Sequence, residues 1–376
     1  MKKLNILILS WRGPGHPNAG GAEISTHEHA KGWVKAGYTV TLFTSYFSHA
    51  KREEVVDGVQ IKRYGRQMLG VQWEAFIWYL FKLHQKFDLV IDQFHGIPFF
   101  TPLYVRIKKL AFIHEVAKEV WGLNPWPKPF NLLPAFLGMY LEPLIFKILY
   151  KKIPFMTVSK STKDDLIEWG IPDKNITIIH NGINIPKDVK IFEKEKEPTL
   201  IFLGVLSRDK GIEDALEVFS ILPTKVKWKF WVVGRGGKEY LKHLKFLCKK
   251  LNIEKQVIFY DFVDERRKFE LLSRANLLIN TSIREGWGLV VIEAASVGTP
   301  TVGYNVAGLR DSIKNGITGL LCNPNPKDCR EEILSLINNK KNYNILRENC
   351  LKWGSKFSWE KSVKESLELI EKIARS

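Results

Sequence analysis

Two successive series of apolar segments, each alternating with amphipathic segments, constrain the fold of this chain most strongly. The first series opens with the continuous apolar run LNILILS (4–10), followed by a glycine-rich loop, an amphipathic stretch and a second run, YTVTLFTS. The second series opens with TLIFLGVLS (199–207) and the amphipathic stretch KGIEDALEVFSIL. Runs that are apolar throughout are typical of parallel strands covered on both faces. We therefore expect an α/β protein with two domains.

Further strands are expected after each of these openings, at 87–94, 110–116, 153–159 and 175–182, and then at 226–234, 255–263 and 275–282. The pattern predicts two Rossmann-like domains with mostly parallel sheets that face each other across a cleft. The charged, proline-containing stretch 185–198 is the best linker. We expect a first domain at 1–187 and a second at 188–356, with a terminal helix at 357–376 that packs back on the first domain.

The charge balance favours anionic partners. Lys and Arg number 57 and Asp and Glu number 40, a net charge of +17. Such a surplus suits nucleotides, nucleic acid or an anionic membrane surface, and a solvated basic surface explains it equally well. Neither half contains a recognisable nucleic-acid module, so nucleic acid is not expected as a partner.

The cysteines and the N-terminus favour a cytoplasmic protein. The four cysteines, Cys248, Cys322, Cys329 and Cys350, form no C-x-x-C pair, which leaves zinc and thioredoxin-like redox sites unsupported. Buried thiols in a reducing compartment are the default interpretation. The apolar run before Trp11 is too short for the core of a signal peptide, and it predicts a first strand instead.

The stretch REGWGLVVIEAASVGTP (284–300) carries the strongest chemical signal. It predicts a helix that begins near Gly288 and ends at Gly298 and Pro300. The free amides at such a helix start attract phosphate. A carboxylate only accepts hydrogen bonds, so Glu285 and Glu293 would seek the hydroxyl groups of a sugar and a ribose. The alternative is that Glu285 is a charged loop residue and Glu293 an exposed helix residue without a ligand.

This stretch resembles the E-x7-E region of the retaining GT-B glycosyltransferases of family 4. Glu285 and Glu293 coincide with the two glutamates of that region, and the family pattern continues to Leu321. The resemblance implies transfer of a hexose from a nucleotide sugar, with UDP or GDP as the expected nucleotide. It assigns donor contacts to the helix start, at Gly286, Trp287, Gly288 and Leu289, with Trp287 where Phe is more usual.

Two glycine-containing loops match the family's phosphate-binding segments. Gly20–Gly21 in NAGGAE matches the loop after the first strand, where glycines let the backbone approach an anion closely. GVLSRDKG (204–211) resembles the diphosphate-clamping loop, with Lys210 at the family's lysine. The family's arginine is replaced by Val205. Arg208 is the alternative source of that charge, and a solvated turn residue explains it equally well.

A histidine at a strand end is the second catalytic candidate beside Glu285. His114 in IHEV occupies the place where the family often has a functional histidine, which could position or polarise a hydroxyl. His95 is a weaker candidate, His180 is interpreted as structural, and His16 stays open. The stretch 262–276 resembles the family segment whose backbone contacts the nucleotide base, so Phe262 and Val263 could bind the base through main-chain groups.

Arg235 could also approach the donor, although a glycine-rich strand exit is common in α/β folds. No D-x-D follows a strand, so we expect metal-independent chemistry without a cofactor, in which cations and helix amides stabilise the leaving diphosphate. Alternatives are a disaccharide synthase or phosphorylase on the same scaffold, and a non-catalytic carbohydrate- or nucleic-acid-binding protein.

Two aromatic segments that also carry lysines bear on the acceptor. The stretches 73–86 and 121–152 could lie on a membrane, and packing in the core is the alternative, favoured for 73–86. Pro134, Glu142, Pro143 and Lys147 interrupt the second, so no transmembrane segment is predicted. A lipid-linked or cell-surface glycan precursor is the hypothesis for the acceptor, with the protein peripheral on the inner face of the cell membrane.

Overall fold

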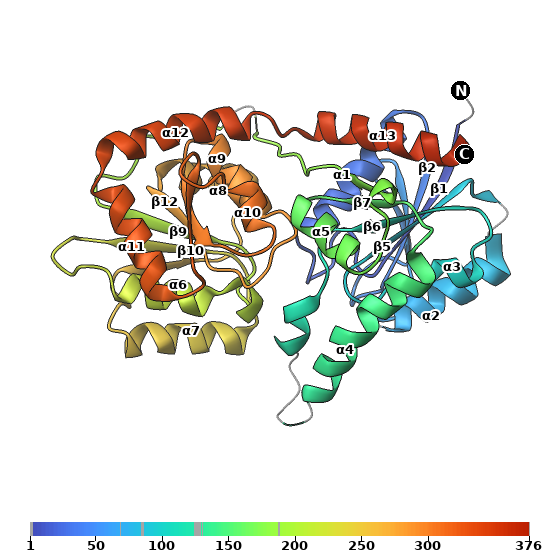
Figure 1. The fold of residues 1–376 in the computed structure, drawn as a ribbon, viewed down its shortest axis with the longest axis horizontal. Coiled ribbons are helices and arrows are strands. Elements are labelled where there is room, and N and C mark those ends of the chain that lie inside the picture. Colours follow the sequence, from blue (N-terminus) through green and yellow to red (C-terminus); the bar gives the residue numbers. More distant parts are fainter. Residues whose placement is uncertain are drawn as a thin grey trace. The chain divides into compact units, whose positions relative to one another are not determined.

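The computed structural model describes residues 3–67, 69–83, 86–123, 129, 131–186 and 189–375. The chain forms two compact units (Figure 1). Unit 1 contains residues up to Gly182 together with Ser358–Ser376, and unit 2 contains Ile183–Phe357. Each unit has a mostly parallel sheet with helices on both faces, which confirms the predicted fold class. The terminal helix α13 (Trp359–Arg375) belongs to unit 1.

The sheet of unit 1 has the strand order β3-β4-β2-β1-β5-β6-β7-β8. All neighbouring pairs are parallel except β3 and β4, which form an antiparallel hairpin. The strands are β1 (Asn5–Ser10), β2 (Thr39–Thr44), β3 (Glu53–Val56), β4 (Val59–Arg63), β5 (Leu89–Phe94), β6 (Lys108–Ile113), β7 (Phe155–Thr157) and β8 (Ile176–Ile178). The order from β4 to β7 is that of a Rossmann sheet, with β1 at its centre.

The hairpin of β3 and β4 is an element that our sequence analysis missed. Its strands are short and partly polar, so they lack the continuous apolar runs of the central strands. The turn residues Asp57 and Gly58 both have positive φ, at 50° and 81°. An Asp-Gly pair between two strands is a strong hairpin signal, and it was available in the sequence.

Two groups of helices cover the sheet of unit 1. On one face, α1 (Gly21–Lys35) packs with α13, and the buried ring of His29 and the indole of Trp33 both hydrogen-bond Ser366 at 2.9 Å. The other face buries apolar side chains against α2 (Leu69–Trp78), η1 (Tyr79–Leu83), α3 (Thr101–Tyr104), η4 (Phe146–Tyr150) and α5 (Lys160–Glu168). A short helix, η3 (Lys118–Leu123), and α4 (Leu132–Ile145) precede η4.

Unit 2 has the strand order β11-β10-β9-β12-β13-β14, and every printed pair is parallel. This is the doubly wound order in which the chain changes direction between β9 and β12. The strands are β9 (Thr199–Leu203), β10 (Lys229–Val233), β11 (Val257–Tyr260), β12 (Leu277–Asn280), β13 (Thr301–Tyr304) and β14 (Gly319–Cys322). Each lies within or beside an apolar run of the sequence.

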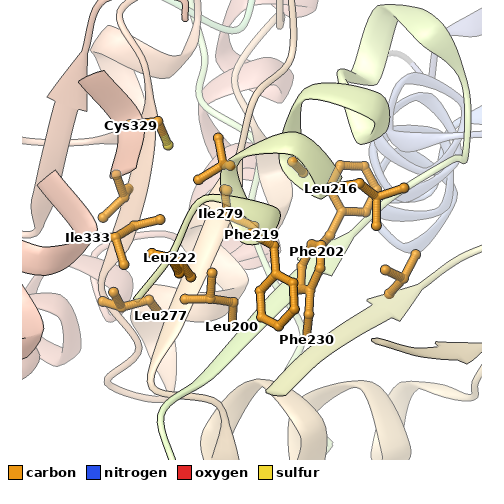
Figure 2. Packing of buried hydrophobic residues seen from close by; sticks show 14 of the residues in the cluster. Leu200, Phe202, Leu216, Phe219, Leu222, Phe230, Leu277, Ile279, Cys329 and Ile333 are labelled. Atoms are coloured by element: carbon orange, nitrogen blue, oxygen red, sulfur yellow. The ribbon is translucent and has the colours of Figure 1, made fainter. Parts of the chain in front are cut away.

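Alternating side chains of these strands build one core on each face of the sheet. Leu200 and Phe202 of β9 pack with Phe219 and Phe230 on one face, as Figure 2 shows, whereas Ile201 packs on the other. The first face is covered by α6 (Ile212–Ser220), α7 (Lys238–Lys250) and α11 (Pro326–Ile337), and the second by α8 (Glu265–Arg274), α9 (Leu289–Ser296) and α10 (Leu309–Ser312). The helix α12 (Lys340–Gly354) packs against α9 and α11. All four cysteines are buried free thiols.

The described part of the predicted linker is attached to unit 2. Arg274 Nη2 lies 2.6 Å from Glu195 Oε1, and the main-chain N–H of Glu195 donates to the carbonyl of Arg274 at 2.8 Å. Lys194 Nζ donates to the carbonyl of Ala275 at 2.8 Å, and burial holds the pKa of this lysine well below its usual range. These bonds anchor the described part of the predicted linker beside α8.

Candidate active site

The candidate donor site lies at the carboxyl ends of β9 and β12, the point in unit 2 where ligands bind in doubly wound sheets. The loops that follow these strands are bonded to each other. Ile283 N donates to the carbonyl of Asp209 at 2.9 Å, and Thr281 Oγ1 donates to the carbonyl of Gly211 at 2.7 Å. Gly211 has a φ of 68°, and a Cβ there would lie 1.9 Å from the carbonyl oxygen of Thr281. Only glycine permits this approach.

This approach brings together Lys210 and Glu285. Lys210 Nζ lies 2.9 Å from Glu285 Oε1, and the same carboxylate oxygen accepts from Ser282 Oγ at 2.8 Å. The main chain of Glu285 is held by a bond from its N–H to the carbonyl of Ala307. Both side chains of the pair are partly exposed, so a ligand can reach them. The site thus offers a cation and a carboxylate side by side.

The helix start predicted near Gly288 is confirmed as the beginning of α9. Gly288 is its N-cap with a φ of 70°, and no side chain caps the helix among the described residues. The first amides of α9, from Leu289 on, therefore lack a side-chain acceptor, as a phosphate-binding helix start requires. Trp287 is 3% exposed, and its ring lies 5.3 Å from that of Phe357. The indole packs inside unit 2, so Trp287 and the buried Gly286 can offer a ligand main-chain groups.

Glu293 lies in the second turn of α9 and forms an ion pair that the sequence did not reveal. Its Oε1 is 2.6 Å from Lys268 Nζ, and Lys268 also bonds Glu265 of the same helix, α8. Burial raises the pKa of Glu293, and Lys268 partly offsets this rise. Burial alone would lower the pKa of Lys268, but the two carboxylates raise it and keep the ammonium charged. From the sequence, the amphipathic pattern of 262–276 indicates only that Lys268 lies on a helix, and it does not indicate the partner of this lysine.

In the predicted diphosphate-clamping loop (204–211), both basic residues lie near its C-terminal end. Arg208 and Lys210 lie in the single turn η6 (Arg208–Lys210), and Arg208 is exposed. Val205, at the family's arginine position, is 47% exposed, an unusual environment for valine. Next to this loop, the guanidinium of Arg235 stacks on Phe262, with its Cζ 3.9 Å from the ring centroid. Arg235 follows β10 and Phe262 follows β11, so both lie at the carboxyl edge.

In unit 1 the glycine pair Gly20–Gly21 begins α1 at the carboxyl end of β1. Gly20 is the N-cap, and its N–H donates to Glu23 Oε2 at 2.6 Å while Arg12 Nε bonds Glu23 Oε1 at 2.9 Å. A Cβ at Gly21 would meet no atom within 4 Å in the described chain. Packing within the protein therefore does not demand glycine at this position, and the space beside it is open to a ligand.

His114 directly follows β6 and is 7% exposed. Neither ring nitrogen has a hydrogen-bond partner among the described residues, although its carbonyl accepts from Thr162 Oγ1 at 3.0 Å. Burial lowers the pKa of His114 to about 3, so the ring is neutral at pH 7. A buried polar ring without a partner is costly and rare, and it is well suited to bind a ligand hydroxyl.

The other histidines have clearer roles in the fold. His95 Nδ1 lies 3.7 Å from Glu115 Oε1 and its ring lies beside Trp11, so the loops after β1, β5 and β6 meet at this edge. His180 Nδ1 bonds the carbonyl of Val158 at 2.8 Å. His16 Nδ1 accepts from the N–H of Asn18, and burial lowers the pKa of His16. Over the described ranges, no three His, Cys, Asp or Glu side chains are grouped to hold a metal ion.

Two doubly wound units, one with a cation and a carboxylate beside an uncapped helix start, define a GT-B-type sugar-transferring enzyme. The model of glycosyl transferases group 1 matches residues 184–353, and the model of Glycosyltransferase Family 4 matches residues 19–186. The chain therefore belongs to the GT-B glycosyltransferases of group 1 and family 4.

Individual relatives cover almost the whole chain. An uncharacterised glycosyltransferase of Methanocaldococcus jannaschii is 26% identical over 99% of this chain and 100% of its own length. The structure of sucrose-phosphate synthase from Thermosynechococcus elongatus matches with a TM-score of 0.80 at 19% identity, covering 99% of this chain and 100% of that one. Anabaena HepE, solved in complex with UDP and glucose, matches with a TM-score of 0.74 at 15% identity, covering 98% and 100%. At these identities the two structures establish the fold.

Proposed function

We propose that the protein is a retaining hexosyltransferase that moves a sugar from a nucleotide sugar to an acceptor hydroxyl. The observation that carries this proposal is the pair Lys210–Glu285 beside the uncapped start of α9, at the switch point of unit 2. A diphosphate needs cations and amides, whereas sugar hydroxyls need acceptors. This constellation supplies both within one pair of loops.

The proposed reaction exchanges one glycosidic bond for another. The bond between the anomeric carbon and the diphosphate oxygen breaks, and the acceptor oxygen bonds to the anomeric carbon on the same face. The acceptor's proton passes to the leaving diphosphate. Lys210, the amides of α9 and the exposed Arg208 would stabilise the charge that develops on the diphosphate. Glu285 would release Lys210 and accept hydroxyls of the donor sugar.

His114 and the Gly20–Gly21 loop are the residues of unit 1 that we assign to the same reaction. A neutral imidazole with no partner for either nitrogen among the described residues can accept from one hydroxyl and donate to another. The open space beside Gly21 suits a close contact between backbone and ligand. These roles follow from the family resemblance, and the burial of His114 supports the first.

For the nucleotide we propose UDP or GDP, with Glu293 as acceptor for the ribose hydroxyls. The complex of Anabaena HepE with UDP and glucose supports UDP. Lys268 would keep the carboxylate of Glu293 ionised in its buried position, which favours hydrogen bonds from hydroxyls. Thermal-shift measurements with UDP, GDP and ADP sugars would identify the nucleotide, because a bound ligand raises the apparent melting temperature.

We also propose turnover without a metal ion or cofactor. The support is the set of cations and amides that can take the place of a metal at the diphosphate, and the lack of a D-x-D after any predicted strand. Activity should persist in EDTA at the level measured in Mg²⁺. A rate that requires a divalent ion would contradict this part of the proposal.

For the acceptor we propose a lipid-linked glycan precursor, and for the location the cytoplasmic face of the cell membrane. The support is the helix α4, whose exposed positions are almost all apolar. Such a surface is unusual on a protein that works in bulk water.

The decisive experiment is a donor-turnover assay on Glu285→Gln. Loss of the carboxylate should reduce transfer and donor hydrolysis by about 100-fold, because the charged acceptor of the sugar hydroxyls becomes a neutral amide with one accepting oxygen. Glu254→Gln serves as the matched control, because Glu254 is exposed and precedes β11, at the opposite edge of the sheet of unit 2. If Glu285→Gln turns the donor over as fast as the control, the catalytic assignment fails. A non-catalytic binding protein would show no turnover in either variant.

A further inference from the structure

The helix formed by α4 and η4 has an exposed surface that is almost entirely apolar. Between Asn131 and Tyr150 ten positions are exposed, and Lys147 is the only charged one. The other nine, which we call the apolar helix face, are Leu132, Leu133, Phe136, Leu137, Met139, Tyr140, Leu141, Leu144 and Ile148, exposed by 43–65%. A helix on a water-soluble surface shows the reverse pattern, with polar residues outward.

The opposite side of this helix is attached to unit 1 by a narrow stripe. Its buried residues are Ala135, Glu142, Phe146 and Tyr150, at spacings that keep them on one helix face. Glu142 accepts from the N–H of Ala117 at 3.1 Å and from the indole of Trp121 at 2.8 Å. Tyr150 donates to the buried Asp92 at 2.6 Å. These bonds orient the helix, so the apolar helix face cannot turn into the core.

Neighbouring elements extend the apolar surface. Tyr104 of α3 contacts the rings of Phe76 and Tyr79 from α2 and η1, and α3 also packs against η4. All these elements cover the same face of the sheet. Their large exposed apolar side chains include Leu69, Trp73, Phe81 and Leu103, which are 57–77% exposed.

The charges around the apolar helix face are mainly positive. Lys147, Lys151 and Lys152 are exposed at its C-terminal end, and Arg106 is exposed just after α3. The one acid between 131 and 152 is Glu142, which is buried and bonded to the body of unit 1. Exposed acids on the neighbouring elements include Glu74 of α2 and Glu119 of η3, which packs against α4. An apolar surface bordered by lysines complements an anionic lipid surface.

We propose that unit 1 docks on an anionic phospholipid bilayer through the apolar helix face, with α4 and η4 lying in the plane of the interface. By length and composition, Leu132–Tyr150 could cross a membrane: an 18-residue window within it has a mean hydropathy of 1.6, and 17% of that window is buried. A spanning helix is incompatible with a stripe that is packed on the sheet and bonded through Glu142 and Tyr150. This inference deepens the proposed membrane location and requires no bound donor.

The first test is flotation of the full chain with vesicles of phosphatidylglycerol and phosphatidylcholine, and with phosphatidylcholine alone. Leu133→Gln, Leu137→Gln and Leu144→Gln combined should weaken binding to the mixed vesicles by about tenfold or more, because less apolar area enters the lipid. The control combines Phe246→Gln, Ile258→Gln and Ile317→Gln, which are equally exposed side chains of unit 2. Unbound wild-type protein, or equal binding of both triple variants, would overturn the proposal.

A second set of variants tests the charges. Lys147→Gln, Lys151→Gln and Lys152→Gln should each weaken binding to the anionic vesicles about fivefold and leave binding to phosphatidylcholine unchanged. If binding does not depend on these lysines or on salt, the anionic bilayer is the wrong partner. If the leucine variant instead converts a dimer to a monomer in light scattering, a second copy covers the surface and the proposal fails.

The orientation is tested with a fluorophore at Leu133→Cys or Ile148→Cys, since the four native thiols are buried. Dithionite added outside sealed vesicles should quench both positions, because an in-plane helix stays in the outer leaflet. Protection of one end would show a spanning helix. Donor titration in lipid-free buffer is the independent measure of the proposed function: it should be unchanged in the leucine variant. Wild-type protein that binds the donor but not the vesicles would refute docking and leave the proposed function standing.

Discussion

Lys210 and Glu285 are 75 residues apart in the chain, yet their side chains form a 2.9 Å ion pair. The pair exists because β9 and β12 are neighbours in the sheet of unit 2, so the loops after them share one edge. In this pair the carboxylate neutralises the ammonium. We expect the donor to separate them, with the diphosphate taking the lysine and the sugar hydroxyls taking the glutamate.

Removing the ammonium should therefore affect the transition state more than the fold. Lys210→Ala is expected to lower kcat/KM by about 100-fold, because a cation at the leaving diphosphate is lost. Lys242→Ala on α7 removes a lysine that is paired but 74% exposed, and it should leave the rate unchanged. The measurement is steady-state turnover of the identified nucleotide sugar. Equal rates for the two variants would remove Lys210 from the site.

The second prediction concerns the displaced arginine of the clamp. If Arg208 supplies the charge missing at Val205, Arg208→Ala should weaken donor binding by about tenfold, as expected for one charge-assisted hydrogen bond. Adding Val205→Arg should restore affinity, and the exposure of Val205 makes this substitution mild for the fold. Calorimetric titration of the nucleoside diphosphate measures both. Unchanged affinity in Arg208→Ala would leave this arginine as a solvated turn residue.

The third prediction concerns His114, whose ring is buried and has no partner among the described residues. His114→Ala should lower kcat by about 100-fold while the donor dissociation constant stays the same, because the ring acts on a reacting hydroxyl. The pKa of His114 is about 3, so the wild-type pH–rate profile should show no ionisation from this ring between pH 5 and 8. If the wild-type profile shows an ionisation near pH 6.5 that is absent in His114→Ala, the ring titrates in the active range, and the role proposed for a neutral His114 is wrong.

The fourth prediction concerns the buried pair Lys268–Glu293. Lys268→Met should lower the free energy of unfolding by about 3 kcal/mol, because it leaves a buried carboxylate without its cation. Adding Glu293→Gln should recover most of the loss, and urea unfolding measures both changes. The exposed pair Lys242–Glu239 provides the comparison, where Lys242→Met should cost less than about 1 kcal/mol. If Lys268→Met loses no more stability than Lys242→Met, the pair Lys268–Glu293 is dispensable for the fold.

The fifth prediction uses the buried His29, which joins α1 to α13 through Ser366. Burial lowers the pKa of His29 to about 3, whereas the unfolded chain titrates near 6.5. Its contribution to stability is therefore complete above about pH 6.5 and falls as the pH drops towards 3. The free energy of unfolding of the wild type should fall as the pH is lowered, and that of His29→Gln should fall less steeply. Near pH 5 the two slopes should differ by about 1.4 kcal/mol per pH unit. Urea unfolding of the wild type and the variant between about pH 4 and 6 measures both slopes, and equal slopes would contradict the prediction.

Local pattern was sufficient for the central strands and for the start of α9 at Gly288. These features depend on a few adjacent residues: apolar runs make buried strands, and glycines permit backbone that other residues avoid. The family glutamates Glu285 and Glu293 were likewise recognisable from their spacing alone.

Tertiary structure decided which side chains face each other and which face water. The partners of Glu285 and Glu293 are lysines from other segments, and sheet order, rather than spacing along the chain, brings them there. The stretch 131–150 reads equally well as a core helix or a surface helix, because apolar composition does not say how much of a helix a neighbour covers. Only the narrow packing stripe of Ala135, Glu142, Phe146 and Tyr150 shows that most of its apolar area is left uncovered. Burial is a property of the assembled fold, so the sequence predicted the helices and strands but not which of their side chains are exposed or which partners they contact.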